Sequence, residues 1–240
     1  MPIDVPVSRR AATAATWPLG MAWTSWQYIW RILPVYRREE EGALEEDLPP
    51  PLPDDVSQEE IQLPRDGCGP LLHRTYSCTI ADSPATADGV IAPLAEDPNR
   101  VAPWHLARFR KTTGTKGRLV KGDEFLVHMP GPWDGPVRAV EVRPDGFRFA
   151  TLAGHLEAGQ IEWRAWDDGQ LHFAVESWAR GGDRLSAVMH DRLRMAKEVQ
   201  LYMWTSVVER VPRLVGGRLL DGVHVETRRV PPEAFERAAT

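Results

Sequence analysis

The residues of this chain best suited to chemistry lie in short glycine-flanked loops. The loop AGHLEAG holds His155 and Glu157, whose imidazole and carboxylate could act as a catalytic acid/base pair. The loops PGPWDGP and RGGD hold Trp133, Asp134 and Arg180. Arg180 would bind an anionic group of a ligand, and Trp133 would stack on the ligand or close over it. The alternative is that these are loop polar groups with no role in a site.

The sequence lacks the motifs of several other kinds of site. It has no HExxH or CxxC spacing for zinc, no GxGxxG or GxxxxGK[ST] loop for nucleotides and no GxSxG elbow. We therefore expect no metal and no cofactor. The net charge of -5 and the pI near 5.8 argue against a nucleic-acid partner, which needs a basic face.

Cysteine content and the N-terminus suggest a compartment. Cys68 and Cys78 are the two cysteines and do not make a disulfide scaffold, so a reducing compartment is expected. Because no secretory signal is evident, we expect a cytoplasmic protein.

Antiparallel strands must position the loops. Alternating segments predict strands at 73–80, 105–111, 123–129, 136–143, 147–152, 160–166 and 170–179. Alternation of strand direction then places the loops 130–136, 153–159 and 180–183 at one end of the sheet. A loop bulged at Gly169 would pair Ile161 with Val175, Trp163 with Phe173 and Ala165 with Leu171, which puts all of these apolar side chains on one face.

A long C-terminal helix, Asp183 to about Leu214, carries a broad apolar stripe and needs a large partner surface. A helix pair from Ala85 to about Ala102, capped by Ser83, precedes most of the strands. The order predicts an α+β helix-grip fold, in which a curved antiparallel sheet of about seven strands wraps one long helix. START domains and birch-pollen-allergen-like proteins have this arrangement and enclose an apolar cavity. Here Trp163, Gln200 and Met203 are expected to line the cavity.

Residues 1–70 read as an extension of the main domain, 71–230, and residues 231–240 as a tail. Four tryptophans, Trp17, Trp23, Trp26 and Trp30, predict an aromatic helix over about 19–33 that docks on the protein or lies in a membrane surface. The charge run RREEEGALEED predicts a solvated turn or short helix. Pro49 to Pro51 indicate a stiff connector, with a proline-rich docking ligand as the alternative.

Several segments resemble the bacterial and plant family called domain of unknown function 1990. They are MPGPWDGPVRAVEV, FATLAGHLEAGQIEW, ESWARGGDRL and RMAKEVQLYMWTSVVERV, together with TSWQYIWRILPVYRREEEG near the start. In the TLPGHPExGEE-like loop of that family, Ala153 stands where Pro is usual and Gln160 where Glu is usual. The resemblance implies the same segmentation but no activity.

The function expected is binding of a small, largely apolar molecule between the sheet and the last helix. One alternative is an enzyme of isomerase, cyclase or hydrolase type that uses His155 and Glu157 at the same cavity. Another is a membrane-associated protein anchored by the tryptophan-rich helix. An apolar cavity without convergent polar groups would favour the binder, whereas an inward His155 with a carboxylate partner would favour the enzyme. The sequence leaves the oligomeric state open.

Overall fold

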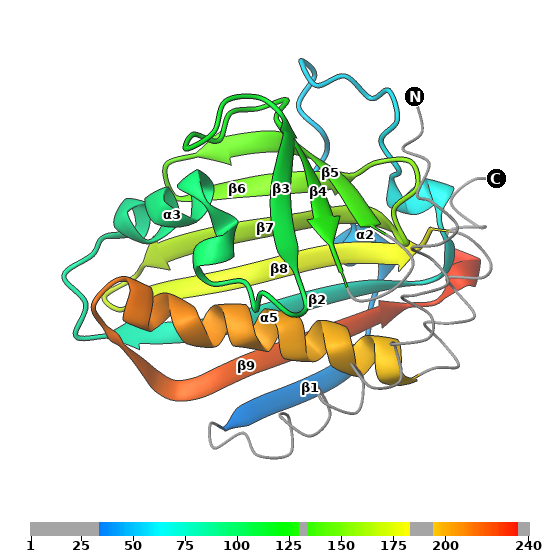
Figure 1. Cartoon of the computed structure of the whole chain (residues 1–240). Helices are drawn as coiled ribbons and strands as arrows, with labels where there is room; N and C mark the ends of the chain where they lie inside the picture. The colour runs from blue at the N-terminus through cyan, green and yellow to red at the C-terminus, as the bar shows by residue number, and fades with distance from the viewer. Residues whose placement is uncertain (1–33, 130–133, 183–193, 235–240) are drawn as a thin grey trace.

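The computed structural model describes residues 34–129, 134–182 and 194–234, and in the last helix it describes side chains from Gln200 onward. Within these ranges nine strands form one curved sheet in the order β1-β9-β2-β8-β7-β6-β5-β4-β3 (Figure 1). β1 and β9 run parallel, and the other neighbours run antiparallel. The strands are β1 (Val35–Glu41), β2 (Cys68–Ala81), β3 (Arg108–Thr113), β4 (Glu124–His128), β5 (Asp134–Arg143), β6 (Gly146–Thr151), β7 (Glu157–Asp167), β8 (Leu171–Gly181) and β9 (Arg218–Val230).

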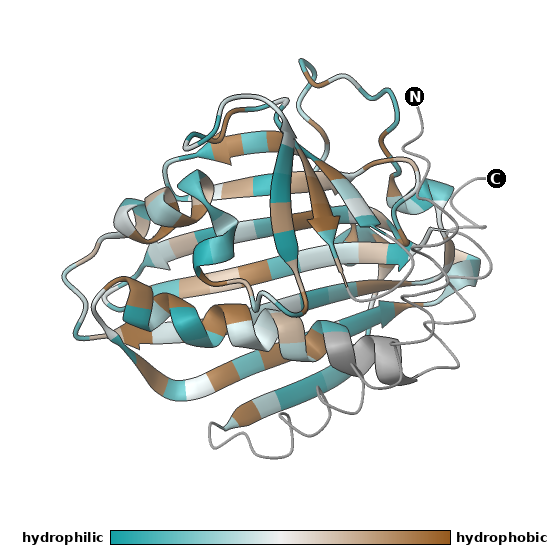
Figure 2. Ribbon diagram, in the orientation of Figure 1, coloured by the Kyte–Doolittle hydropathy of each residue, from teal (hydrophilic) through white to brown (hydrophobic). Residues whose placement is uncertain are grey.

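One face of the sheet, which we call the inner face, is covered by helices. The helix α3 (Ala87–Glu96) packs against β6, β7 and β8, and α5 (Arg194–Leu214) packs against β2, β8 and β9. Figure 2 shows apolar and polar residues alternating along the strands beneath α5. Full burial of each large apolar side chain stabilises the fold by roughly 1.5–3 kcal/mol. A curved sheet that wraps a long helix is the helix-grip arrangement predicted from the element order.

The other face, the outer face, is crossed by residues 42–67. This segment includes α2 (Leu44–Asp47) and the 3₁₀ turn η1 (Pro64–Asp66). Val56 packs against Val140 and Ala150, and Ile61 forms a bridge to Leu152. The described part of the expected extension therefore lies on the sheet. The aromatic helix predicted over 19–33 falls outside the described residues.

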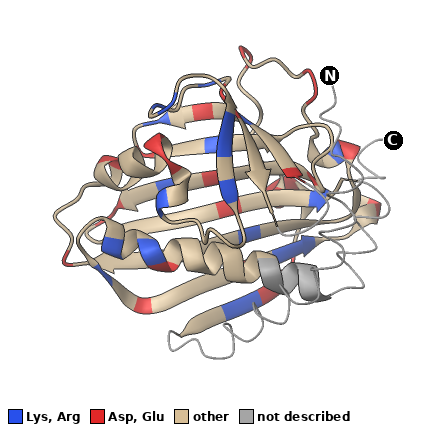
Figure 3. Ribbon diagram, viewed as in Figure 1, with Lys and Arg blue, Asp and Glu red and all other residues tan. Residues whose placement is uncertain are grey.

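The prediction of about seven strands was wrong because it missed β1 and β9. β1 has the sequence VYRREEE, and every side chain after Val35 is exposed, so no apolar alternation marks it. Its backbone pairs with β9 as the edge of the sheet. Figure 3 shows charged residues along β1 and along β3, the other edge strand. Charged side chains on edge strands oppose pairing with other chains.

The β7–β8 hairpin keeps its predicted faces, but its register was predicted wrongly by two residues. Trp163 pairs with Val175 and Ala165 with Phe173. Because side chains in a strand alternate with a period of two, this displacement leaves each of them on the predicted face. Gly169, with φ 106°, supplies the left-handed residue of the turn.

The helix starts also differ from prediction. α3 begins at Ala87, and the Thr86 hydroxyl caps it by accepting from the Gly89 N–H at 3.3 Å. The predicted cap, Ser83, instead donates to the Val215 carbonyl at 2.8 Å. The 3₁₀ turn η2 (Pro98–Arg100) follows α3. The predicted start of the long helix, at Asp183, lies outside the described residues, and α5 ends at Leu214 as expected.

Candidate functional site

The loops predicted to lie at one end of the sheet are in contact there. A Cβ added to Gly135 would lie 2.7 Å from His155 Nε2. The Gly182 N–H donates to the Leu156 carbonyl at 2.6 Å. The described parts of 130–136, 153–159 and 180–183 are therefore neighbours, as strand alternation predicts. Trp133, the expected lid, lies outside the described residues.

His155 is partly buried at this end, and its ring faces Gly135. Its Nδ1 accepts from the Glu157 N–H at 2.9 Å, so the neutral ring carries its proton on Nε2. Burial lowers the pKa of His155 and outweighs the opposing effect of the Glu157 carboxylate. The imidazole is thus bonded to the backbone of its own loop. A catalytic role for His155 and Glu157 remains a prediction.

Three polar side chains from different elements meet on the inner face, and we call them the inner polar chain: Arg74 of β2, Gln200 of α5 and Glu157 of β7. Gln200 Oε1 accepts from Arg74 Nη1 at 2.5 Å. Gln200 Nε2 donates to Glu157 Oε1 and Oε2, each at 3.2 Å. The amide therefore separates a guanidinium from a carboxylate.

Strand alternation explains why Arg74 points inward. Arg74 shares its face with Tyr76, Cys78 and Ile80, which belong to the main core. The sequence analysis missed this residue. The available signal was a single charged residue on the apolar face of HRTYSCTI, which predicts a charge turned toward the core.

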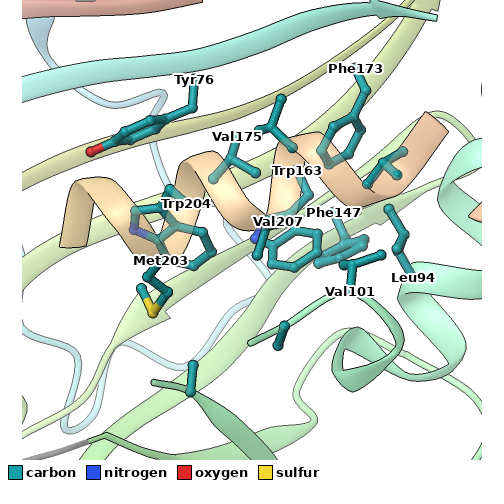
Figure 4. Packing of buried hydrophobic residues seen from close by; sticks show 14 of the residues in the cluster. Tyr76, Leu94, Val101, Phe147, Trp163, Phe173, Val175, Met203, Trp204 and Val207 are labelled. Carbon is teal, nitrogen blue, oxygen red and sulfur yellow. The ribbon is translucent and has the colours of Figure 1, made fainter. Parts of the chain in front are cut away.

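Aromatic residues continue the inner face beyond the inner polar chain. In Figure 4, Tyr76, Met203 and Trp204 lie toward one end of α5, and Phe173 and Leu94 toward the other. Trp163 and Trp204 stand edge to face, with ring centroids 5.8 Å apart. The indole nitrogens of both are enclosed without an acceptor among the described residues. Trp163 and Met203 are buried between sheet and helix. That they line a ligand cavity stays a prediction.

Burial raises the pKa of the Tyr76 phenol, and the charge of neighbouring Arg74 partly offsets the rise. The phenol is therefore neutral at physiological pH, with its O–H available as a donor. The Tyr76 hydroxyl lies next to Arg74 and is a further polar group at this end of the core.

Two predicted ligand contacts lie elsewhere. Arg180 is on the outer face, where its Nε donates to the Gly69 carbonyl at 2.8 Å and its Nη1 to the Pro64 carbonyl at 3.1 Å. Asp134 Oδ1 is hydrogen-bonded to His128 Nδ1 at 2.9 Å, also on the outer face. Both residues were predicted to lie in loops, at 130–136 and 180–183, but the structure places Asp134 at the start of β5 and Arg180 near the end of β8, with their side chains on the outer face. Their role as ligand contacts stays a prediction.

A pocket of about 530 Å³ lies on the outer face between residues 50–54 and the sheet. Arg143 pairs there with Glu162 at 2.5 Å, and Arg148 pairs with Glu141 at 2.8 Å. Three acidic side chains, Asp54, Glu141 and Glu162, line this pocket together with the two basic ones, Arg143 and Arg148. Its basic side chains are therefore already matched by carboxylates.

The described residues also bear on two other possibilities, a metal site and a membrane-spanning helix. Among the described residues, no three His, Cys, Asp or Glu side chains are grouped as metal ligands would be. Over the same part of the chain, no helix combines the length and apolarity that crossing a membrane requires.

The fold and the site define a helix-grip protein with a buried polar chain beneath its last helix. No protein-family model matches the chain, and no curated protein matches it. The likeness to domain of unknown function 1990 therefore stays a resemblance.

Several solved structures are similar in fold. The di-domain ARO/CYC StfQ from the steffimycin biosynthetic pathway is 14% identical with a TM-score of 0.44, over 74% of this chain and 54% of that one. Norcoclaurine synthase from Thalictrum flavum is 10% identical with a TM-score of 0.42, over 62% and 88%. Ginseng major latex-like protein 151 from Panax ginseng is 14% identical with a TM-score of 0.36, over 55% and 95%. Similarity at this level assigns no activity.

Proposed function

We propose that this protein binds a small molecule with a largely apolar body and one polar end, held between the sheet and α5. The observation that carries the proposal is the convergence of Arg74, Gln200 and Glu157 beside a buried aromatic cluster. Small-molecule sites typically combine an apolar lining with a few placed polar groups. In this proposal Tyr76 and Met203 would contact the apolar body.

The convergence of polar groups does not by itself separate binding from catalysis, because an apolar cavity without such groups was the feature expected of a binder. Binding is favoured over catalysis by the hydrogen bonding of His155. A general base must reach the proton that it removes. The Nδ1 atom already accepts the Glu157 N–H at 2.9 Å, and the Nε2 edge of the ring faces Gly135. The isomerase, cyclase or hydrolase alternative would require this loop to rearrange. The membrane alternative depends on the tryptophan-rich segment outside the described residues.

The test is native mass spectrometry of the full chain purified from its own host, combined with uptake of the neutral dye Nile red. Wild-type protein should retain a small molecule and should take up the dye. Gln200→Trp should block both, because the larger side chain would fill the space beside Arg74. Arg213→Trp is the matched control, since it adds the same side chain at an exposed position of α5.

Two results would contradict the proposal. One is equal retention and equal dye uptake in wild type and Gln200→Trp. The other is a wild-type protein that neither retains a small molecule nor takes up Nile red. Thermal melts of both variants would show that each is folded, so that loss of binding reports on the site.

A further inference from the structure

Arg74 is a buried cation, and the part of the chain that the structure describes places no buried anion in contact with it. The residue is only 7% exposed, and the neutral side chains of Gln200 and Tyr76 are its described partners. Among the described residues, no carboxylate lies within ion-pair distance of its guanidinium. Burying an unpaired charge is strongly unfavourable, and buried charges in proteins are usually paired.

The guanidinium also has hydrogen-bonding capacity left over. It offers five N–H donors on its three nitrogens. Gln200 takes Nη1, and Tyr76 accounts for at most one more nitrogen. No Arg74 nitrogen is among the enclosed atoms that lack a partner, so a nitrogen that neither Gln200 nor Tyr76 binds is not fully enclosed by the protein. A ligand oxygen could therefore approach it.

A hydroxyl faces the same region. Ser177 pairs with Arg74 across the β2–β8 ladder, and its side chain is on the inner face with Phe173 and Val175. The residue is 5% exposed, and none of the described hydrogen bonds uses its hydroxyl. Arg74 and Ser177 together offer donors for both oxygens of one small acidic group.

The charge of that group follows from what surrounds Arg74. One guanidinium balances one negative charge, and the Glu157 carboxylate stands on the far side of the Gln200 amide. A dianion such as a phosphate monoester would meet repulsion from Glu157, whereas a carboxylate would be matched. The planar fork of a guanidinium also fits a carboxylate in shape.

We infer that the molecule bound between the sheet and α5 is a carboxylic acid, with its carboxylate on Arg74 and Ser177 and its apolar body against Met203 and Trp204. This inference rests on the proposed function and names the class of ligand for the same site. Before the ligand enters, Gln200 and Tyr76 hold the guanidinium in place.

The test compares decanoate with decan-1-ol by calorimetry on the full chain at neutral pH, below the micelle concentration of either. These probes share a chain length and differ in the charged end. Wild-type protein should bind decanoate at least about tenfold more tightly, which corresponds to about 1.4 kcal/mol. Arg74→Gln should remove this preference and leave the affinity for decan-1-ol within about twofold. Arg74→Lys should keep part of the preference, because the charge remains.

Equal affinity of wild type for the two probes, or an unchanged preference in Arg74→Gln, would overturn the inference. So would failure of wild type to bind decanoate. The proposed function is judged separately, by retained mass and by Nile red uptake in wild type and Gln200→Trp. If Arg74→Gln fails to fold, Ser177→Ala provides the second variant and should lower the affinity for decanoate but not for decan-1-ol.

Discussion

His73 and Arg74 are adjacent in the sequence, so their side chains lie on opposite faces of β2. Arg74 enters the core, whereas His73 lies on the outer face between two carboxylates. Its Nδ1 contacts Asp47 Oδ1 and its Nε2 contacts Glu176 Oε1, each at 2.7 Å. A ring that donates from both nitrogens is protonated, so this contact joins α2 to the sheet through a charged histidine.

We expect this contact to make stability depend on pH. Burial lowers the pKa of His73, but the hydrogen bonds to Glu176 and Asp47 outweigh burial and raise the pKa above its ordinary value of 6.5. The contribution to stability is therefore complete below the unfolded-state pKa and is lost as pH rises through the folded-state pKa. Urea unfolding of wild type should show a falling free energy across that window, relative to His73→Gln. Parallel pH profiles for the two proteins would contradict this.

Gly135 is the residue that gives the His155 ring its space. A Cβ there would lie 2.7 Å from Nε2 and 2.9 Å from Cδ2 of the ring. Gly135→Ala should therefore destabilise the protein by about 1–3 kcal/mol through overpacking. The same substitution made in His155→Ala should cost much less, because the clash is removed. Gly89→Ala is the control: its Cβ would meet nothing closer than 3.4 Å. A similar cost in both backgrounds would show that the ring is not what Gly135 accommodates.

At the scale of elements, most strands with apolar alternation were predicted. β9 was missed although its Val223 and Val225 alternate with exposed residues, whereas β1 has no such alternation. In β7 and β8 the apolar residues Trp163, Phe173 and Val175 alternate with polar ones and so predict an inner face. That face is buried as predicted. β1 is an exposed strand made mostly of charged residues. It is held by backbone pairing with β9, and backbone pairing cannot be recognised from a pattern of side chains. The register of the β7–β8 hairpin was missed for a related reason, since displacement by two residues leaves the faces unchanged.

The face assignment leads to a prediction for the core. Phe173 is fully buried, and it stands edge to face with Trp163 at a centroid separation of 6.3 Å. Phe173→Ala should lower the free energy of unfolding by about 3–5 kcal/mol, through lost burial and the cavity that remains. Denaturant unfolding measures the change, with exposed Gln170→Ala as the control. A loss below about 1 kcal/mol would be inconsistent with a packed aromatic at this position.

At the scale of the whole molecule, the two faces of the sheet differ in what they carry. Its outer face carries residues 42–67, and its inner face carries the aromatic core and the inner polar chain. The sequence predicted the wrapped helix and the meeting of the loops. The inward position of Arg74 had a signal in the alternation of HRTYSCTI that was missed. Its partners could not be predicted, because they come from elements far apart in the chain and only the folded sheet brings them together.

The measurement that tests the central claim most directly is the indole N–H spectrum of the ¹⁵N-labelled chain during titration with decanoate. Trp163 and Trp204 lie between the sheet and α5, whereas Trp104 is 83% exposed and serves as the surface reference. Trp→Phe variants assign the three signals. Binding between sheet and helix predicts that the Trp204 and Trp163 signals move together and saturate while the Trp104 signal stays in place. Movement of the Trp104 signal with Trp163 and Trp204 unchanged would contradict a ligand site beneath α5.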